Sequence, residues 1–211
     1  MVNPVLWLLS GANGVGKTNF AFKHIRAITK SSRFLNADEI ARGLSPFDPE
    51  LERMRAGRIA LQILQDTLRA QDTPRANDAT AKSLTVETTL SGRTHLKTIE
   101  TAHAAGWPVH ILYFAVRTPE ISLARIARRV SEGGHNVPEV DARRRFARSL
   151  QNLPAYLEAC DFWRVYDNNA PQPNTVAEGR QGCMSWQGED WSGLPETMPG
   201  LLAALPACPE A

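Results

Sequence analysis

The chain has 211 residues, a hydrophobic fraction of 43% and a formal net charge of +2. These values are typical of a soluble globular domain with a hydrophobic core, and the charge favours no particular partner. Three widely spaced cysteines without a CxxC pair argue against a disulfide framework or a zinc site, so we expect a reducing compartment. No segment has the length of a membrane span and no secretory signal pattern is present, so we expect a cytoplasmic protein without a membrane partner.

Apolar segments that alternate with helical patterns predict the fold. The expected strands span residues 5–9, 33–36, 83–87, 109–116 and 163–166. Apolar residues at helical spacing lie between them, at residues 19–28, 51–70 and 94–105. Strands that alternate with helices indicate βαβ units and a parallel sheet with helices on both faces.

Two segments fall outside this alternation. Residues 71–82 are polar and predict a surface loop. After residue 168, proline and glycine interrupt any long element, although Trp186 and Trp191 suggest some packing on the body. We therefore expect one domain over residues 1–169 and a Pro/Gly-rich tail over residues 170–211 that is partly packed or disordered.

A complete phosphate-binding loop, G-x-x-x-x-G-K-[ST], lies between the first predicted strand and the following helix. Its residues are Gly11, Ala12, Asn13, Gly14, Val15, Gly16, Lys17 and Thr18. Glycines let successive backbone N–H groups turn toward phosphate oxygens. Lys17 is placed to reach the β- and γ-phosphates of a nucleotide, and the hydroxyl of Thr18 is placed to ligate Mg²⁺. The loop therefore predicts nucleotide binding.

Two carboxylates follow predicted strands, at the edge of a parallel sheet where ligands gather. Asp38 follows the second strand. Three roles are open for its side chain. It could accept a proton from a substrate hydroxyl as a base, orient Mg²⁺-bound water, or form the N-cap of the next helix. Glu87 ends the third strand and precedes hydroxyl residues and Arg93. These side chains are expected to contact a polar or anionic substrate, or to form a turn into the next helix.

Arginines are concentrated over residues 125–148. They are Arg125, Arg128, Arg129, Arg143, Arg144, Arg145 and Arg148. The first three lie opposite the apolar face of a predicted helix, and a glycine-containing hinge separates them from the others. We expect an Arg-rich helical lid that neutralises a phosphoryl group, with an ordinary solvated helix face as the alternative for most of the seven. Without interleaved aromatic residues, nucleic-acid binding is disfavoured.

The fifth predicted strand is followed by Asp167-Asn168-Asn169. At this position Asn168 is expected in a loop over the adenine of the nucleotide, or in a simple turn.

These motifs follow one another along the first 169 residues, and together they resemble the zeta-toxin family of P-loop kinases. The resemblance is strongest to its small bacterial branch, often labelled predicted ABC-type ATPase. It implies a three-layer, nucleoside-kinase-like fold with a parallel sheet of five strands in the order 2-3-1-4-5. It further implies ATP-dependent phosphorylation of a UDP-sugar such as UDP-N-acetylglucosamine, ATP and Mg²⁺ as cofactors, and a protein antitoxin as partner.

The resemblance also assigns roles to residues on the donor and base side. Lys17 and Thr18 match the residues that hold phosphates and Mg²⁺, and Asp38 matches the catalytic base. Arg129 and Arg145 match the two lid arginines that stabilise the transferred phosphoryl group, with Arg128 and Arg144 as close rivals.

On the acceptor side, Glu87 and Thr89 match the acid and the hydroxyl that contact the substrate. This chain departs from the family at Ser91, where the toxins usually have an arginine two residues after the threonine. Arg93 is expected to substitute for that arginine. Two other functions stay open: an ATP-binding regulatory switch with little transferase activity, and a polynucleotide 5′-kinase.

Overall fold

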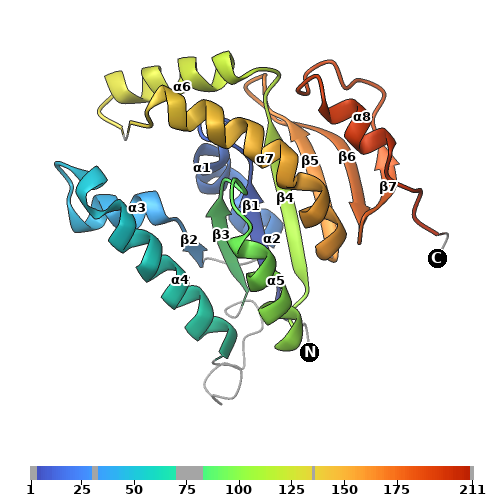
Figure 1. The fold of residues 1–211 in the computed structure, drawn as a ribbon, viewed down its shortest axis with the longest axis horizontal. Helices are drawn as coiled ribbons and strands as arrows, with labels where there is room; N and C mark the ends of the chain where they lie inside the picture. The colour runs from blue at the N-terminus through green and yellow to red at the C-terminus, as the bar shows by residue number, and fades with distance from the viewer. Residues whose placement is uncertain (1–3, 30–32, 70–82, 135, 210–211) are drawn as a thin grey trace.

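The computed structural model describes residues 4–29, 33–69, 83–134 and 136–209, and a central sheet with helices on both faces dominates it (Figure 1). The strand order is β2-β3-β1-β4-β5-β6-β7. The parallel strands are β1 (Leu6–Ser10), β2 (Phe34–Leu35), β3 (Leu84–Thr88), β4 (Val109–Ala115) and β5 (Phe162–Asp167). The expected parallel α/β fold with the order 2-3-1-4-5 is confirmed. The loop expected at residues 71–82, and His135, lie outside the described residues.

Helices connect the parallel strands. Those before β3 are α1 (Lys17–Phe20), the π-helical turn η1 (Ala21–Ile25), α2 (Arg26–Thr29), α3 (Ala37–Leu44), the 3-10 turn η2 (Pro49–Glu52) and α4 (Arg53–Arg69). Those after β3 are α5 (Thr94–Ala104), α6 (Pro119–Ser131) and α7 (Glu139–Ala159), whereas α8 (Met198–Ala203) follows the last strand and connects none of them. Among the described residues, no helix combines the length and apolar character needed to cross a membrane.

The central strands are apolar on both faces, and each face has its own core. On β1, Leu8 packs in a cluster with Leu64 of α4 and Tyr156 of α7, whereas Leu9 packs in a second cluster with Phe20 of α1. Successive side chains of a strand point to opposite faces, so a continuously apolar strand requires a helical layer on each side. The parallel pairing of β1, β2 and β3 brings their carboxyl ends together at one edge of the sheet.

The tail extends the sheet by two strands that we did not expect. β6 (Asn174–Arg180) pairs antiparallel with β5, and β7 (Cys183–Gln187) pairs antiparallel with β6. Gln181 and Gly182 connect the two strands with φ angles of 45° and 75°, as in the tight turns of two-residue hairpins. The described sheet therefore has seven strands instead of five, because the glycine that we interpreted as an interruption forms a turn.

A disulfide joins Cys183 to Cys208, which corrects the expectation that the cysteines form none. The C-terminal segment returns alongside β7, where the N–H of Met184 donates to the carbonyl of Pro206 at 2.8 Å and the N–H of Cys208 donates to the carbonyl of Met184 at 2.9 Å. This return brings together two cysteines that are 25 residues apart in the sequence. Cys160 is free and buried.

Candidate functional site

The loop at residues 11–18 turns sharply between β1 and α1. Gly11 and Gly14 have φ angles of 130° and 76°, which side chains with a Cβ rarely adopt. A Cβ on Gly11 would collide with the carbonyl oxygen of Phe114, and a Cβ on Gly14 with that of Ser122. Glycine is therefore required where the loop packs against β4 and α6, and the loop has the glycine-dependent geometry of a phosphate site.

Lys17 is buried at the start of α1. Its Nζ donates to the carbonyl oxygens of Gly11 at 2.9 Å and Ala12 at 2.8 Å, and it lies 3.7 Å from Oε1 of Glu87. Burial lowers the pKa of Lys17 and raises the pKa of Glu87, because the charged form of each is poorly solvated. An anionic ligand beside Lys17 would stabilise its ammonium form.

Glu87 on β3 connects the phosphate loop to the segment after β2. Its two carboxylate oxygens accept hydrogen bonds from the hydroxyl of Thr18 at 3.0 and 2.9 Å, and Oε2 also accepts one from Nδ2 of Asn36 at 2.9 Å. The described residues contain no cluster of three or more His, Cys, Asp or Glu side chains able to hold a metal. A hydroxyl next to a carboxylate does fit Mg²⁺, which usually takes few protein ligands and keeps water and phosphate oxygens.

Asn36, not Asp38, is the N-cap of α3. Its Oδ1 accepts hydrogen bonds from the N–H of Asp38 at 2.8 Å and of Glu39 at 3.4 Å. The N-cap interpretation of Asp38 is therefore wrong. Asp38 lies in the first turn of α3 and lines the cavity described next, so its interpretations as a proton acceptor or a group that orients Mg²⁺-bound water stay open.

A cavity of about 330 Å³ adjoins the phosphate loop. The expected site residues that line it are Asn13, Lys17, Asp38, Glu87, Thr89 and Arg145. α4 contributes an apolar wall, which consists of Gly57, Ala60, Leu61 and Leu64. The segment after Glu87 contributes a polar wall, which consists of Thr88, Thr89, Ser91, Gly92, Thr94 and His95. The cavity therefore connects the phosphate-binding residues with a space for a second molecule.

Two of the seven arginines approach the phosphate loop. Nε and Nη2 of Arg129 are buried without a hydrogen-bond partner. After burial itself, the charge of Arg129 is a further cause of the lowered pKa of Lys17. Nη1 of Arg145 donates to Oδ1 of Asn13 at 3.2 Å, and Arg145 lines the cavity. Unpaired guanidinium nitrogens beside a phosphate loop fit an anionic ligand.

The rival arginines form ion pairs within the lid. Arg128 lies 3.7 Å from Glu132, and Arg144 lies 2.6 Å from Asp141. Both arginines are exposed, as is expected for a solvated helix face. The structure therefore brings Arg129 and Arg145 to the loop and leaves Arg128 and Arg144 on the surface.

Three further expected residues differ in their placement. The Oγ1 of Thr89 lies 2.8 Å from the Oγ of Ser91, and both residues line the cavity. Arg93 is exposed just before α5 and is not among the lining residues, so its position does not support the expectation that it replaces the missing arginine. Asn168 is buried, and its Nδ2 donates to the carbonyl of Val15 at 2.6 Å. Asn168 thus supports the phosphate loop, and its contact with adenine stays a prediction.

Two residues of the site were missed in the sequence. Asn36 was a detectable N-cap, because asparagine is favoured at that position. His95 gave no signal, since a single histidine near the start of a helical pattern is not distinctive. His95 lines the cavity, its Nδ1 is buried without a hydrogen-bond partner, and burial lowers its pKa to about 4.

The fold and the phosphate-binding loop together define a P-loop nucleotide-binding protein. The model of the AAA domain family matches residues 6–153, and the chain belongs to this family. An uncharacterized protein of Haemophilus influenzae is 30% identical over 146 residues, which are 66% of this chain and 95% of that protein.

Solved structures share the fold at low sequence identity. The AvrRxo1-ORF1:-ORF2 structure with ATP has a TM-score of 0.66 at 19% identity, over 99% of this chain and 66% of that chain. The AvrRxo1 structure with sulphate ions has a TM-score of 0.65 at 20% identity, and the match covers 87% of this chain and 60% of that chain. This chain thus spans less than two thirds of the AvrRxo1 chains. The PezAT toxin-antitoxin structure from Streptococcus pneumoniae has a TM-score of 0.61 at 16% identity, and the match covers 84% of this chain and 72% of that chain. The expected zeta-toxin-like fold is confirmed.

Proposed function

We propose that the protein transfers the γ-phosphoryl group of ATP to a hydroxyl group of a small molecule. The observation that carries this proposal is the shared cavity, in which the loop lysine Lys17, the carboxylate of Asp38 and the guanidinium of Arg145 line one space. Phosphoryl transfer needs little beyond positioning and charge stabilisation. This cavity supplies positioning and charge stabilisation, because a phosphate-binding cation, a carboxylate and a lid arginine surround it.

The donor half of the site is assigned to residues 11–18. The glycine-dependent turn and the unpaired nitrogens of Arg129 support ATP as the ligand of this half. Thr18 would hold Mg²⁺, with Glu87 orienting its hydroxyl. Mg²⁺ bound there neutralises phosphate charge.

Asp38 is the proposed base. Its carboxylate accepts the proton of the acceptor hydroxyl while the hydroxyl oxygen forms a bond to the γ-phosphorus and the bond to the β–γ bridging oxygen breaks, so that ADP leaves. Lys17, Arg129 and Arg145 stabilise the negative charge that spreads over the transferred group.

The acceptor that we propose is a UDP-sugar such as UDP-N-acetylglucosamine. The zeta-toxin resemblance supports this assignment. The cavity offers Glu87 and the hydroxyl of Thr89 to sugar hydroxyls, and its apolar wall on α4 suits a ring.

Asp38→Asn tests the proposed reaction. We expect the variant to bind ATP normally and to lose phosphorylation by about 100- to 10,000-fold, because a general base acts on the chemical step. The assay incubates the protein with ATP, Mg²⁺ and a panel of UDP-sugars, and it measures ADP together with the mass gain of one phosphate on the sugar. Glu39→Gln is the matched control, since Glu39 is the next residue of α3 and pairs with Arg42 at 3.5 Å. Normal turnover of Asp38→Asn would exclude Asp38 as the base.

The same assay separates the alternative functions. Tight ATP binding without ADP formation for any acceptor would favour a regulatory switch. Acceptor-dependent ADP formation with a 5′-hydroxyl oligonucleotide, and with no sugar, would favour a polynucleotide kinase.

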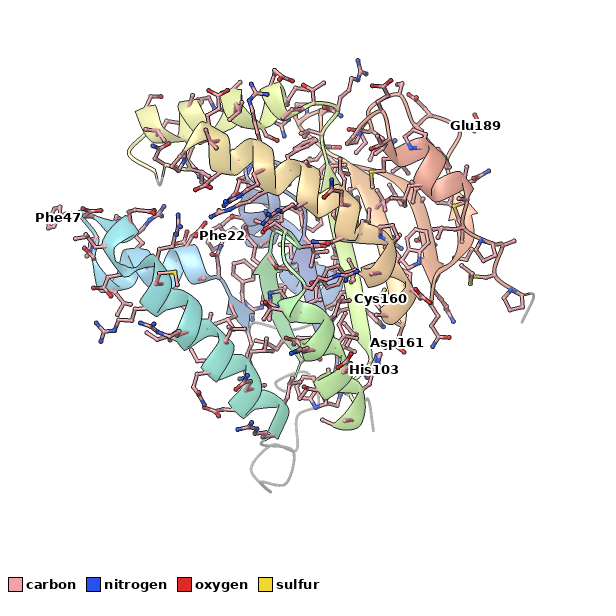
Figure 2. All side chains as sticks on the ribbon, in the orientation of Figure 1. Phe22, Phe47, His103, Cys160, Asp161 and Glu189 are labelled. Atoms are coloured by element: carbon pink, nitrogen blue, oxygen red, sulfur yellow. A yellow bond between two sulfur atoms is a disulfide. The ribbon has the colours of Figure 1, made fainter. Side chains whose placement is uncertain are left out.

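We also propose a protein antitoxin as partner. PezAT is a toxin-antitoxin system, and the AvrRxo1 structures contain a second protein. On this chain, Phe47, Leu51 and Met54 are largely exposed around η2, and Figure 2 shows Phe47 at the outer end of this region. Growth arrest on expression that requires Lys17 would support a toxin role.

A further inference from the structure

The cavity wall at the first turn of α5 contains a polar group that the proposed reaction does not use. His95 lines the cavity, and its Nδ1 is buried without a hydrogen-bond partner. Because Nδ1 is closed to solvent, a ligand in the cavity would meet the ring at its other nitrogen, Nε2. A neutral imidazole has one nitrogen that donates a hydrogen bond and one that accepts, so this wall offers a ligand one specific polar contact.

The backbone around His95 is held in place by α7. The hydroxyl of Tyr156 donates to the carbonyl of Gly92 at 2.8 Å, three residues before His95. Nδ2 of Asn152 donates to the carbonyl of Leu90 at 2.9 Å. The segment that carries His95 is thus positioned before any ligand arrives, which favours a specific contact over an adaptable one.

The charge around the cavity restricts the group that His95 can meet. Among the described lining residues, the cationic side chains are Lys17 and Arg145, and both form hydrogen bonds with the phosphate loop. The lowered pKa of His95, about 4, leaves its imidazole neutral near pH 7. An anionic group at this wall would be desolvated without a counter-charge, which is unfavourable.

We infer that His95 is a specificity-determining residue that forms a hydrogen bond with an uncharged hydroxyl or amide group of the acceptor. The opposite wall on α4 is apolar, so the group lies between a hydrogen-bonding wall and a hydrophobic one. This inference rests on the proposed function, because it concerns the molecule that receives the phosphoryl group.

Substitutions at His95 test the inference with UDP-N-acetylglucosamine as the probe. His95→Phe keeps a ring and removes both nitrogens. We expect it to raise the KM for UDP-N-acetylglucosamine by about 5- to 100-fold, the effect of one buried group left unpaired, and to leave the KM for ATP unchanged. His95→Asn places an amide near the Nδ1 position and His95→Gln near the Nε2 position. Rescue by one of the two identifies the nitrogen that binds.

His103→Phe is the matched control. His103 lies on the same helix, is not among the cavity-lining residues, and contacts Asp161 on the outside of the molecule (Figure 2). We expect wild-type values of both KM constants for this variant. An unchanged sugar KM in His95→Phe, with normal turnover, would overturn the role of His95 and leave the proposed function intact. Absence of turnover and of binding with every UDP-sugar would overturn the proposed acceptor, and the inference with it.

Nitrogen NMR of the histidine rings supplies a readout that a merely structural role would not move. The His95 signals are assigned by their loss in His95→Asn. We expect UDP-N-acetylglucosamine to shift one ring nitrogen of His95 while the pattern of a neutral imidazole persists at pH 7. Conversion to the imidazolium pattern on binding would show an anionic group at this wall and would contradict the inference.

Discussion

Arg128 and Arg129 are sequence neighbours on α6, and they have different surroundings. The Arg128 side chain is exposed and pairs with Glu132 one turn along the helix. Two guanidinium nitrogens of Arg129 are buried and unpaired. Burying part of a cation without a partner is costly in a folded protein, which makes Arg129 the residue whose environment improves most when phosphate binds.

This contrast leads to a paired prediction. We expect Arg129→Ala to lower kcat of acceptor-dependent ADP formation by about 100- to 1000-fold, because a charge-stabilising donor is lost from the transition state. Arg128→Ala should stay within about twofold of wild type, since an exposed ion pair contributes little. Steady-state kinetics of the two variants, measured side by side, checks the prediction. Equal losses in both would show that the lid acts through its overall charge.

The family resemblance pointed to Arg129 and Arg145, but the helical pattern could not separate them from the neighbouring arginines. Helical spacing put Arg125, Arg128 and Arg129 on one polar face, and spacing alone does not tell which side chain is covered by the loop below. The choice depends on how α6 packs over Gly14, whose absent Cβ leaves room for the carbonyl of Ser122. Such a contact between distant segments is a property of the tertiary structure.

At the scale of elements, Asn36 couples the start of α3 to the end of β3. Its Oδ1 caps the helix that carries Asp38, and its Nδ2 donates to Glu87. One side chain thus sets the position of the proposed base relative to the acid beside Thr18. An N-cap is a local feature that sequence can reveal, whereas the second hydrogen bond requires that β2 and β3 be neighbours.

Asn36→Asp separates the two roles of this residue. Aspartate caps as well as asparagine does, but it places a second carboxylate beside Glu87, whose pKa burial already raises. A raised pKa in the folded state means stability that is present below the ordinary value and is lost as the pH rises. We therefore expect the variant to be less stable than wild type by about 1–3 kcal/mol at pH 8, and by much less at pH 4, which lies below the ordinary pKa of a glutamate.

Urea unfolding at the two pH values measures this difference. Asn36→Ser keeps a capping oxygen and loses the donor to Glu87 without adding charge, so its loss of stability should depend less on pH than that of Asn36→Asp. A deficit in Asn36→Asp that is the same at pH 4 and pH 8 would rule out the repulsion with Glu87.

At the scale of the whole molecule, the C-terminal region completes the sheet. The hairpin β6–β7 lies against β5 (Figure 1). The disulfide between Cys183 and Cys208 fastens β7 to the segment that follows α8. The parallel strands and their order were predictable because apolar runs, the phosphate loop and polar strand ends repeat along the chain. The hairpin was not predictable in this way, because polar residues are mixed into its strands. Its turn also contains a glycine, which reads as an interruption in the sequence.

The disulfide is expected to stabilise the folded chain. Removal of both sulfurs in a Cys183→Ser, Cys208→Ser double variant should lower the free energy of unfolding by about 2–4 kcal/mol, since the cross-link restricts the unfolded chain. Guanidinium unfolding with and without a reductant checks this. The reductant should bring the wild-type protein to the stability of the variant and leave the variant unchanged. A wild type that is insensitive to the reductant would contradict the expectation.

The hydrogen bond from Asn168 to the carbonyl of Val15 has a consequence for how the protein can be divided. The family match stops at residue 153, inside α7, so a fragment trimmed to that match would lack β5 and the asparagine that follows it. The neighbouring Asn169 also donates to the carbonyl of Gly193 at 2.6 Å, which ties the same turn to the C-terminal region. The segment by which the family is recognised thus contains the phosphate loop but lacks one of the side chains that hold it.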